Sequence, residues 1–548
     1  MEIAARVMST VRTSMSNSDT SLPSSSSSSL AQTNGAASHS KVGMVMDVSD
    51  AAFIGGFIPS LIEKQKYPYT RPEFLYFSDD DIPLAADHSV RPVICPKLPH
   101  RMPLYVGYAE VINAGKTIEN EDQASAKMLV LTQQGSDDRG SRGRRLTSST
   151  SKDDDCMLMP DNDDNESSSS MCIPKVDAAL FGLFDGHAGS AVAIVASKCL
   201  HEHIKSRLCE VLEAILHLDR QESLNFGKHR SESSYSMSSR IKEEDRTNIR
   251  SEHLVKGAIE TAFVEMDEQI SEDKQVWRLP GGCAAISVLV FLGKLFVANA
   301  GDCRAILVTS EGTKPLSKDL TPASERKRLQ EIAYRCPELI GNAFSRLEYS
   351  RRLTRKDLKT KVLYRDWFMD GWAAKVVKEH DLRAPLISDS SRKRRLLNTI
   401  GVSRGFGDHH LLTVEERLSI KPFLSCVPEI TVTNLRDMNT LTDKDVVIMA
   451  SDGLWDVITN EDAGLIVRST LGSTDPSDPS RYTQAAQELV IAARGYPSGN
   501  NSHKWIMNSG GHASFDDITV FVIPLKYCAA PPTNMEDEDE DDDMLSLE

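Results

Sequence analysis

Ten cysteines occur in this 548-residue chain, but they form no Cys-x-x-Cys pair and follow no regular spacing. A structural zinc site needs closely spaced Cys or His ligands, and a small disulfide-stabilised domain needs a dense cysteine framework. The sequence excludes both classes. We therefore expect the cysteines to be reduced thiols.

A long apolar run is also missing, because no stretch of 18 apolar residues occurs. A helix that crosses a bilayer needs about 20 such residues, so no spanning helix is predicted. No basic and apolar leader with a small-residue cleavage site is present either, and we expect no secretory signal. The expected location is the cytoplasm.

Positive side chains are fewer than negative ones: the chain has 63 Lys and Arg residues and 79 Asp and Glu residues, a formal net charge of -16. Nucleic-acid backbones attract positive surfaces, so this balance argues against a general nucleic-acid binder. Part of the excess is a run of eight acidic residues from Glu536 to Asp543. Such a run is typical of a solvated tail, and we assign it no function.

Composition predicts the domain boundaries. Residues 1–66 are rich in serine and poor in large apolar groups, which indicates a disordered or targeting region, and residues 67–526 are the predicted folded domain. Within that domain, residues 134–170 and 219–250 show no apolar period and are predicted to be disordered insertions. Residues 527–548 are the predicted acidic disordered tail.

The N-terminal region contains two apolar patterns. Ile3, Val7, Val11 and Met15 lie four residues apart between arginines, as in a basic amphipathic helix on a membrane surface, and a mitochondrial presequence has the same pattern. Residues 51–62 are apolar but too short to span a bilayer, and would cover a neighbouring core or lie on a membrane. The sequence leaves these alternatives open. Peripheral contact with a membrane and a location in mitochondria are both alternatives to a purely cytoplasmic location.

The pattern of the predicted domain favours an α+β fold. Apolar spacing predicts helices over residues 190–218 and 254–270, and a third over 482–494 that ends at Gly495. Residues 284–291 and 294–300, joined by Leu292-Gly293, predict an antiparallel hairpin. Helices and antiparallel strands follow each other without regular alternation, which is typical of α+β rather than α/β proteins.

Residues 321–398 form a basic island in an acidic chain, with 19 Lys or Arg residues against 10 Asp or Glu residues. Tyr, Phe and Trp side chains are interleaved with these charges. Arginine and aromatic residues dominate the anchors of protein interfaces, which suggests a docking surface for an acidic or phosphorylated partner. The alternative is a subdomain whose aromatics form its own small core.

Three apolar runs end in an aspartate, at Asp185, Asp302 and Asp452. Two acidic pairs, Glu121-Asp122 and Asp516-Asp517, precede further apolar runs. In an antiparallel sheet the end of one strand lies beside the start of its neighbour, so all five positions are expected at one rim. Crowded carboxylates need compensating cations, and hard divalent ions such as Mg²⁺ or Mn²⁺ prefer oxygen ligands.

With these motifs in order, the sequence resembles the metal-dependent type 2C protein serine/threonine phosphatases. Seven stretches carry the resemblance: Asn120-Glu121-Asp122, Phe184 to Gly189, Gly282 to Ala285, Ala300 to Arg304, Ser403 to Asp408, Ser451 to Asp456, and Asp516 to Thr519. The resemblance implies the αββα four-layer sandwich of that family, two antiparallel sheets flanked by helices. It also implies that residues 321–398 are an enlarged flap beside the active site.

The strings Tyr67 to Leu75 and Gly107 to Lys116, together with the long insert, are similar to the H/J/M branch of the family. For that branch the resemblance implies phosphorylated Rab GTPases as substrates that dock on the flap. A second copy of the chain is a further expected partner.

The resemblance also implies roles for single residues. Asp185 would bridge two Mn²⁺ or Mg²⁺ ions that activate a water, with Asp452 and Asp516 on the first ion and the Gly186 carbonyl and, through water, Glu121 on the second. Asp302 would hold a weaker third ion. His187 would act as the general acid that protonates the leaving oxygen.

One departure concerns the substrate phosphate. Many relatives have an arginine four residues before the glutamate of the first motif, whereas Thr117 stands there in this chain. Lys116 is the predicted substitute, because its ammonium is a point charge that reaches a phosphate oxygen. An alternative function is a catalytically weak scaffold that binds phosphorylated partners without hydrolysing them.

Overall fold

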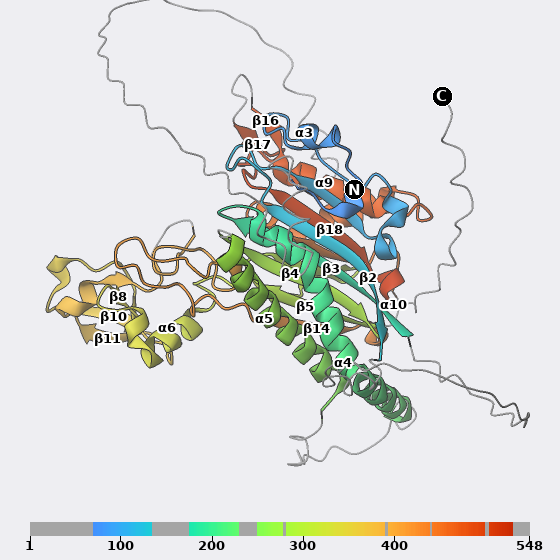
Figure 1. Ribbon diagram of the computed structural model, residues 1–548. Helices are drawn as coiled ribbons and strands as arrows, with labels where there is room; N and C mark the ends of the chain where they lie inside the picture. The colour runs from blue at the N-terminus through green and yellow to red at the C-terminus, as the bar shows by residue number, and fades with distance from the viewer. Residues whose placement is uncertain are drawn as a thin grey trace, which may run out of the picture. The chain divides into compact units, whose positions relative to one another are not determined.

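The computed structural model describes residues 70–133, 175–229, 249–277, 281–388, 393–438, 441–498 and 504–529, with the side chains of 225–229 and 273–277 excepted. These residues all belong to one compact unit, Gln65–Glu548 (Figure 1). The predictions for residues 1–66, 134–170 and most of the acidic tail fall outside the described residues, and they stay predictions.

Two antiparallel sheets lie at the centre of this unit. The first has the strand order β1-β18-β15-β6-β7, and the second has the order β14-β5-β4-β3-β2 with β13 paired to β4. The strands of the first sheet are β1 (Gly107–Val111), β18 (Ile518–Pro524), β15 (Val446–Ala450), β6 (Arg304–Thr309) and β7 (Gly312–Pro315). Those of the second are β14 (Glu429–Asn434), β5 (Lys294–Ala300), β4 (Gly282–Phe291), β3 (Lys175–His187), β2 (Asp122–Thr132) and β13 (Phe406–Gly407).

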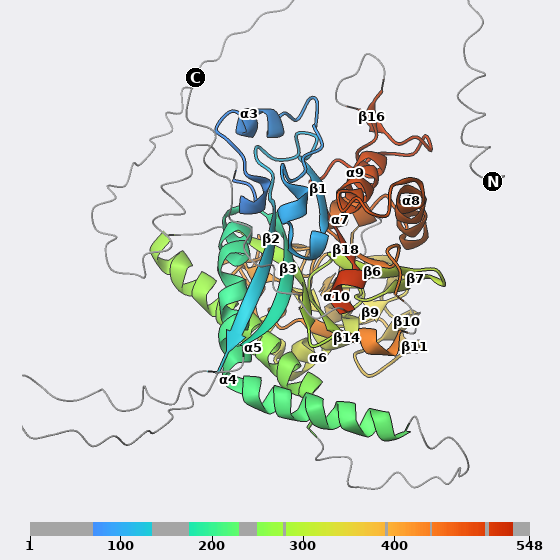
Figure 2. The same ribbon diagram turned by 90° about the vertical axis from the view of Figure 1, so that its right-hand side faces the viewer.

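Helices cover the outer face of each sheet. The helices α4 (Ala191–His229) and α5 (Ser251–Trp277) lie across the second sheet (Figure 1), and α8 (Asn460–Ser473) and α9 (Arg481–Arg494) lie against the first (Figure 2). One apolar cluster joins α4 and α5 to the second sheet, another fills the space between the sheets, and a third joins the first sheet to α8 and α9. The four-layer αββα sandwich is therefore confirmed.

The local patterns explain why these elements form. The apolar spacing of α4 and α5 puts Leu208, Leu212 and Ile215 of one helix and Phe263 and Met266 of the other into the same buried cluster. Residues in the β4–β5 turn, Leu292 and Gly293, both have positive φ, the conformation of a two-residue turn between twisted antiparallel strands. Gly495 caps α9 as predicted, with φ +68° and its N–H donated to the Ile491 carbonyl.

Two predicted boundaries of the sandwich differ from the structure. The helix α4 continues to His229, so the first part of the predicted insertion 219–250 is helical. Asp219 explains part of the extension, because its buried carboxylate pairs with Arg436 and Lys294 at the far end of the sandwich. At the C-terminal end, α10 (Leu525–Ala529) buries Cys528, so the folded domain extends past residue 526.

The predicted flap forms a subdomain beside the sandwich (Figure 1, yellow to orange). It contains α6 (Arg326–Arg335), β8 (Phe344–Ser345), β9 (Glu348–Tyr349), β10 (Lys361–Arg365), β11 (Ala373–Val376) and β12 (Ala384–Pro385). Its apolar core includes Ile420, Phe423 and Leu424, so the packed subdomain extends beyond the predicted end at residue 398. That core is mainly aliphatic, and the aromatics Tyr334, Phe368 and Trp372 are exposed.

Apart from short 3-10 helices, the remaining short elements in the described residues are α3 (Asp81–Ala85), α7 (Asp452–Trp455), β16 (Tyr496–Pro497) and β17 (Trp505–Ile506). The eight cysteines that the structure describes are all free. Among the described helices, none has the length and apolar character that a bilayer-spanning helix requires.

Candidate active site

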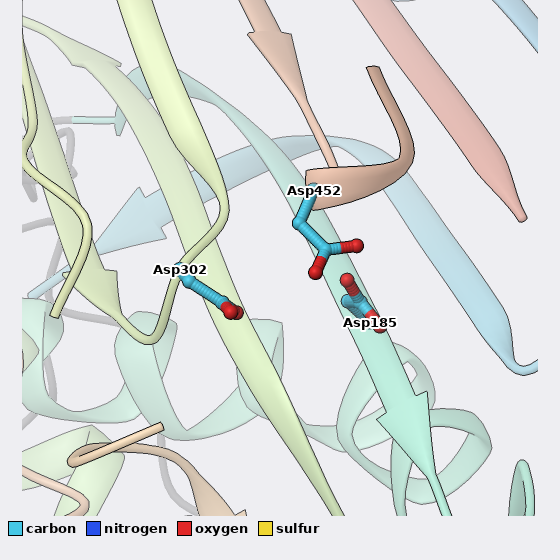
Figure 3. Close-up of side chains that lie close together, drawn as sticks. All are labelled: Asp185, Asp302 and Asp452. Carbon is cyan, nitrogen blue, oxygen red and sulfur yellow. The ribbon is translucent and has the colours of Figure 1, made fainter. Parts of the chain in front are cut away.

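Three aspartates meet where the two sheets adjoin. Asp185 lies in β3, Asp302 follows β5, and Asp452 begins α7 directly after β15. One carboxylate oxygen of each lies within 4.8 Å of the others, and Figure 3 shows the three side chains pointing toward a common space. The prediction placed these acids at one rim of a sheet, whereas in the structure Asp185 and Asp302 come from inner strands of the second sheet and Asp452 from an inner strand of the first.

Asp185 lies inside its strand and does not end it, because β3 continues to His187 and pairs with β2 and β4. This pairing puts Asp185 opposite Asp122 on one side and Ala284 on the other. Gly186 allows the neighbouring strand to approach, since a Cβ there would lie 2.6 Å from the Glu121 carbonyl oxygen. A larger residue would push Glu121 and Asp185 apart.

The electrostatics of this cluster favour a bound cation. Burial, together with the charges of Asp452, Asp122 and Asp302, raises the pKa of Asp185 well above its usual value. Burial and the Asp452 charge raise the pKa of Asp302 to about 7. Clustered carboxylate oxygens are the donors that Mg²⁺ and Mn²⁺ prefer, so the donor set fits the ions that the resemblance implied.

Asp516 is near the cluster but is not one of the three grouped carboxylates. Its oxygens accept hydrogen bonds of 2.7 and 2.5 Å from the Lys116 ammonium. Burial by itself lowers the pKa of Lys116, but the carboxylates of Asp516, Asp185 and Asp452 outweigh it and raise the pKa above its usual value. Lys116 therefore stands at the site as an ammonium ion, at the position where the sequence predicted a cation for the substrate phosphate.

Glu121 lies just before β2, and its side chain contacts the turn that follows β3. Its Oε1 accepts a 2.6 Å hydrogen bond from the Gly189 N–H. Burial raises the pKa of Glu121, while that hydrogen bond and the Lys116 charge act in the opposite direction. Like Asp516, this predicted metal-binding residue is near the cluster but outside the three grouped carboxylates.

The second acid of each acidic pair, Asp122 or Asp517, has a structural role. The buried Asp122 carboxylate accepts 2.7 Å hydrogen bonds from Ser451 and Thr519, which joins the second sheet to the first. The buried Asp517 carboxylate accepts hydrogen bonds from the backbone N–H groups of Asn113 (2.7 Å) and Glu121 (3.0 Å). Both acids therefore fix the backbone beside the cluster.

His187 has a partner that the sequence did not reveal. Its Nε2 lies 2.6 Å from Oδ2 of Asp408, a buried acid just beyond β13, while the His187 side chain is 34% exposed. Burial lowers the pKa of His187, but the hydrogen bond and charge of Asp408 outweigh burial, and the net pKa is raised. Asp408 belongs to one of the seven motifs, which was the signal available for it.

Lys393, from the flap, also reaches the cluster. Its ammonium donates to Oδ2 of Asp452 and lies 3.1 Å from Oδ2 of Asp456. A cavity of about 330 Å³ lies beside it, and Asp302, Thr321 and Arg394 are among the residues that line it. The sequence offered only the basic run Arg392 to Arg395 as a signal, which reasoning from charge assigned to the docking surface.

Comparison with known proteins gives the family of this architecture. The sequence profile described as "Protein phosphatase 2C" matches residues 219–390 and 383–502. Protein phosphatase 1H of Xenopus tropicalis is 40% identical over 491 residues, which cover 84% of this chain and 92% of that protein. Protein phosphatase 1H of Homo sapiens is 39% identical (84% and 91% covered), and protein phosphatase 1J of Mus musculus is 39% identical (83% and 86% covered).

Solved structures are also similar to the chain. A serine-threonine phosphatase 2C from Toxoplasma gondii matches with a TM-score of 0.35 and 18% identity, over 79% of this chain and 98% of that one. A C. elegans sex determining protein matches with a TM-score of 0.33 and 16% identity, over 64% and 58% of the two chains.

Proposed function

The chain belongs to the protein phosphatase 2C family and is a protein serine/threonine phosphatase, and we propose that it hydrolyses phosphoserine and phosphothreonine at the cluster of Asp185, Asp302 and Asp452. The family depends on Mg²⁺ or Mn²⁺. The observation that carries the proposal is the convergence of three carboxylates within 4.8 Å.

We assign the metal-binding roles to acids that surround this cluster. Asp185 would contribute to two ions, Asp452 and Asp516 would hold one of them, and the Gly186 carbonyl with Glu121, through water, would hold the other. Asp302 takes a third ion, and its place in the group with Asp185 and Asp452 supports a role in metal binding. Bound divalent ions supply the positive charge that activates a water and neutralises the phosphoryl oxygens.

His187 is the proposed general acid. Hydrolysis of a phosphate monoester needs a proton on the departing serine or threonine oxygen, and a positioned histidine supplies it. The Asp408 carboxylate holds one ring nitrogen, which fixes the imidazole and favours its protonated form. His187 remains one-third exposed, so the ring is open to a substrate.

Lys116 is the proposed contact to the substrate phosphate. Its ammonium is half-exposed and already turned toward the acids of the site through Asp516. An ammonium binds a phosphate oxygen as a point charge, without the bidentate geometry of an arginine.

The flap is the proposed docking surface for the protein substrate, with phosphorylated Rab GTPases as the candidates. Tyr334, Phe368 and Trp372 are 53%, 65% and 43% exposed, and the rings of Tyr334 and Trp367 lie 5.7 Å apart. The Arg365 guanidinium lies over the Trp372 ring at 4.7 Å. An exposed aromatic cluster with arginines is typical of interface anchors.

A phosphatase assay with chelator and metal tests the catalytic proposal. The purified chain is expected to release phosphate from a phosphothreonine peptide with Mn²⁺ or Mg²⁺ and to lose this activity in excess EDTA. Asp452→Ala should lose both turnover and bound manganese. Full activity in EDTA, or wild-type manganese content in Asp452→Ala, would refute the metal assignment.

The docking proposal needs a separate comparison of two substrates. Phe368→Ser and Trp372→Ser should slow hydrolysis of a phosphorylated Rab and leave hydrolysis of a short phosphopeptide unchanged. Equal rates for wild type and variants on the Rab would reject the flap as the docking surface.

A further inference from the structure

The flap contributes one charged group to the metal cluster, the ammonium of Lys393. It donates to Oδ2 of Asp452, which is one of the three grouped carboxylates, and it lies 3.1 Å from Asp456, the C-cap residue of the same short helix. No other flap residue among those that the structure describes has an ion pair with Asp185, Asp302 or Asp452.

The contact belongs to a fixed part of the flap. Next to Lys393, the Arg394 guanidinium donates to Glu348 of β9 at 3.1 Å, and the Arg395 N–H donates to the Ser388 hydroxyl at 2.8 Å. Leu396 and Leu397 follow immediately and are buried in the flap core. The backbone that carries Lys393 therefore moves with the flap, so the position of the flap determines how far the Lys393 ammonium reaches toward Asp452.

From this placement we propose that Lys393 competes with a divalent cation for Asp452 and so couples the position of the flap to the occupancy of the metal centre. An ammonium and a divalent ion repel each other when they share one carboxylate. Binding of the metal pushes the ammonium away from Asp452, and Asp456 is the acid that can still receive it.

The consequence for regulation follows from thermodynamic reciprocity. If moving Lys393 away from Asp452 strengthens metal binding by some factor, metal binding favours the displaced position of Lys393 by the same factor. A partner that moves the flap segment with Lys393 away from Asp452 would then raise the metal affinity of the enzyme. The inference rests on the metal centre proposed above.

The test measures metal affinity directly, without turnover. Mn²⁺ is titrated into the chelator-treated full chain, and free Mn²⁺ is followed by electron paramagnetic resonance. Lys327→Met is the matched control, because Lys327 is a half-exposed flap lysine that pairs with Asp370, away from the cluster. It removes the same charge from the same subdomain, so the difference between the two variants isolates the contact with Asp452.

Lys393→Met should bind Mn²⁺ at least about fivefold more tightly than Lys327→Met, the lower end of common coupling strengths. Lys393→Arg keeps a cation beside Asp452 and should stay within about twofold of wild type on the same scale. Equal or weaker binding by Lys393→Met, or tighter binding by Lys393→Arg as well, would overturn the proposal. Absence of saturable Mn²⁺ binding in the wild type would instead refute the metal centre itself.

Discussion

At the scale of single residues, the site depends on which partner each ionisable side chain holds. His187 is held by Asp408, and Lys116 is held by Asp516. In both pairs a charged group is fixed beside the place where the phosphate is expected. The two pairs lead to predictions that separate proton transfer from phosphate binding.

Asp408→Asn should reduce turnover because the imidazole loses the anion that orients it and keeps it protonated. General acid catalysis contributes roughly 10²–10⁴-fold, so we expect at least about a tenfold fall in kcat with a phosphothreonine peptide. With p-nitrophenyl phosphate, whose leaving group needs no proton, the fall should be small. An equal loss with both substrates would show that Asp408 acts in some other way.

Lys116→Met should weaken substrate binding, since a charge-assisted hydrogen bond contributes about 1.5–3 kcal/mol. KM for a phosphopeptide should rise about tenfold or more, while Lys116→Arg retains most of the affinity. Steady-state kinetics at saturating Mn²⁺ measures both. If KM is unchanged in Lys116→Met, the phosphate is bound by another group.

At the scale of elements, one carboxylate joins the flap to the motif that carries Asp408. Glu325, just before α6, accepts hydrogen bonds of 2.6 Å from Arg404 and Arg328 and of 2.8 Å from the Ser403 hydroxyl. Burial raises the pKa of Glu325, but these hydrogen bonds and charges outweigh it and lower the pKa from 4.5 to about 2. The flap and the Ser403–Asp408 segment are therefore fixed to each other through one anion.

This link makes stability depend on pH. Because the folded pKa of Glu325 is depressed, its contribution to the free energy of unfolding is complete above about pH 4.5 and is lost as pH falls toward 2. The contribution is about 3 kcal/mol. Urea unfolding between pH 5 and pH 3 should show a steeper loss for wild type than for Glu325→Gln. As a control, Glu331→Gln removes a partly exposed pair with Arg335 and should keep the wild-type slope.

At the scale of the whole molecule, the metal cluster joins the two sheets. Asp185 and Asp302 come from the second sheet, and Asp452 from the end of a strand of the first. A cation held between them binds only the folded chain, because the unfolded chain does not bring these residues together. Metal binding is therefore expected to stabilise the sandwich against separation of its layers.

Mn²⁺ should raise the unfolding temperature of the wild type, with a gain of about 2.7 kcal/mol when free Mn²⁺ is 100 times its dissociation constant. Asp185→Asn removes one of the shared carboxylates and should lose most of this increment. Calorimetry with and without EDTA measures it. An Mn²⁺-induced shift of the same size in Asp185→Asn would contradict the assignment.

The sequence by itself determined the elements and the acids. The spacing of apolar residues predicted α4 and α5, and two apolar runs joined by Leu292-Gly293 predicted the β4–β5 hairpin, since local patterns determine local structure. The motifs gave Asp185, Asp302, Asp452 and His187, because an ionisable residue at a strand end or turn is a local signal. The end of α4 was missed because the buried Asp219 finds its partners Arg436 and Lys294 far away in the chain.

Only the tertiary structure decided how these parts meet. The sheets place Asp302 in the group with Asp185 and Asp452, whereas Asp516 pairs with Lys116. His187 meets Asp408 across 221 positions, and Lys393 meets Asp452 across 59. Such contacts depend on how two sheets and a flap pack against one another, and the packing of distant segments leaves no periodic pattern in the sequence of either segment.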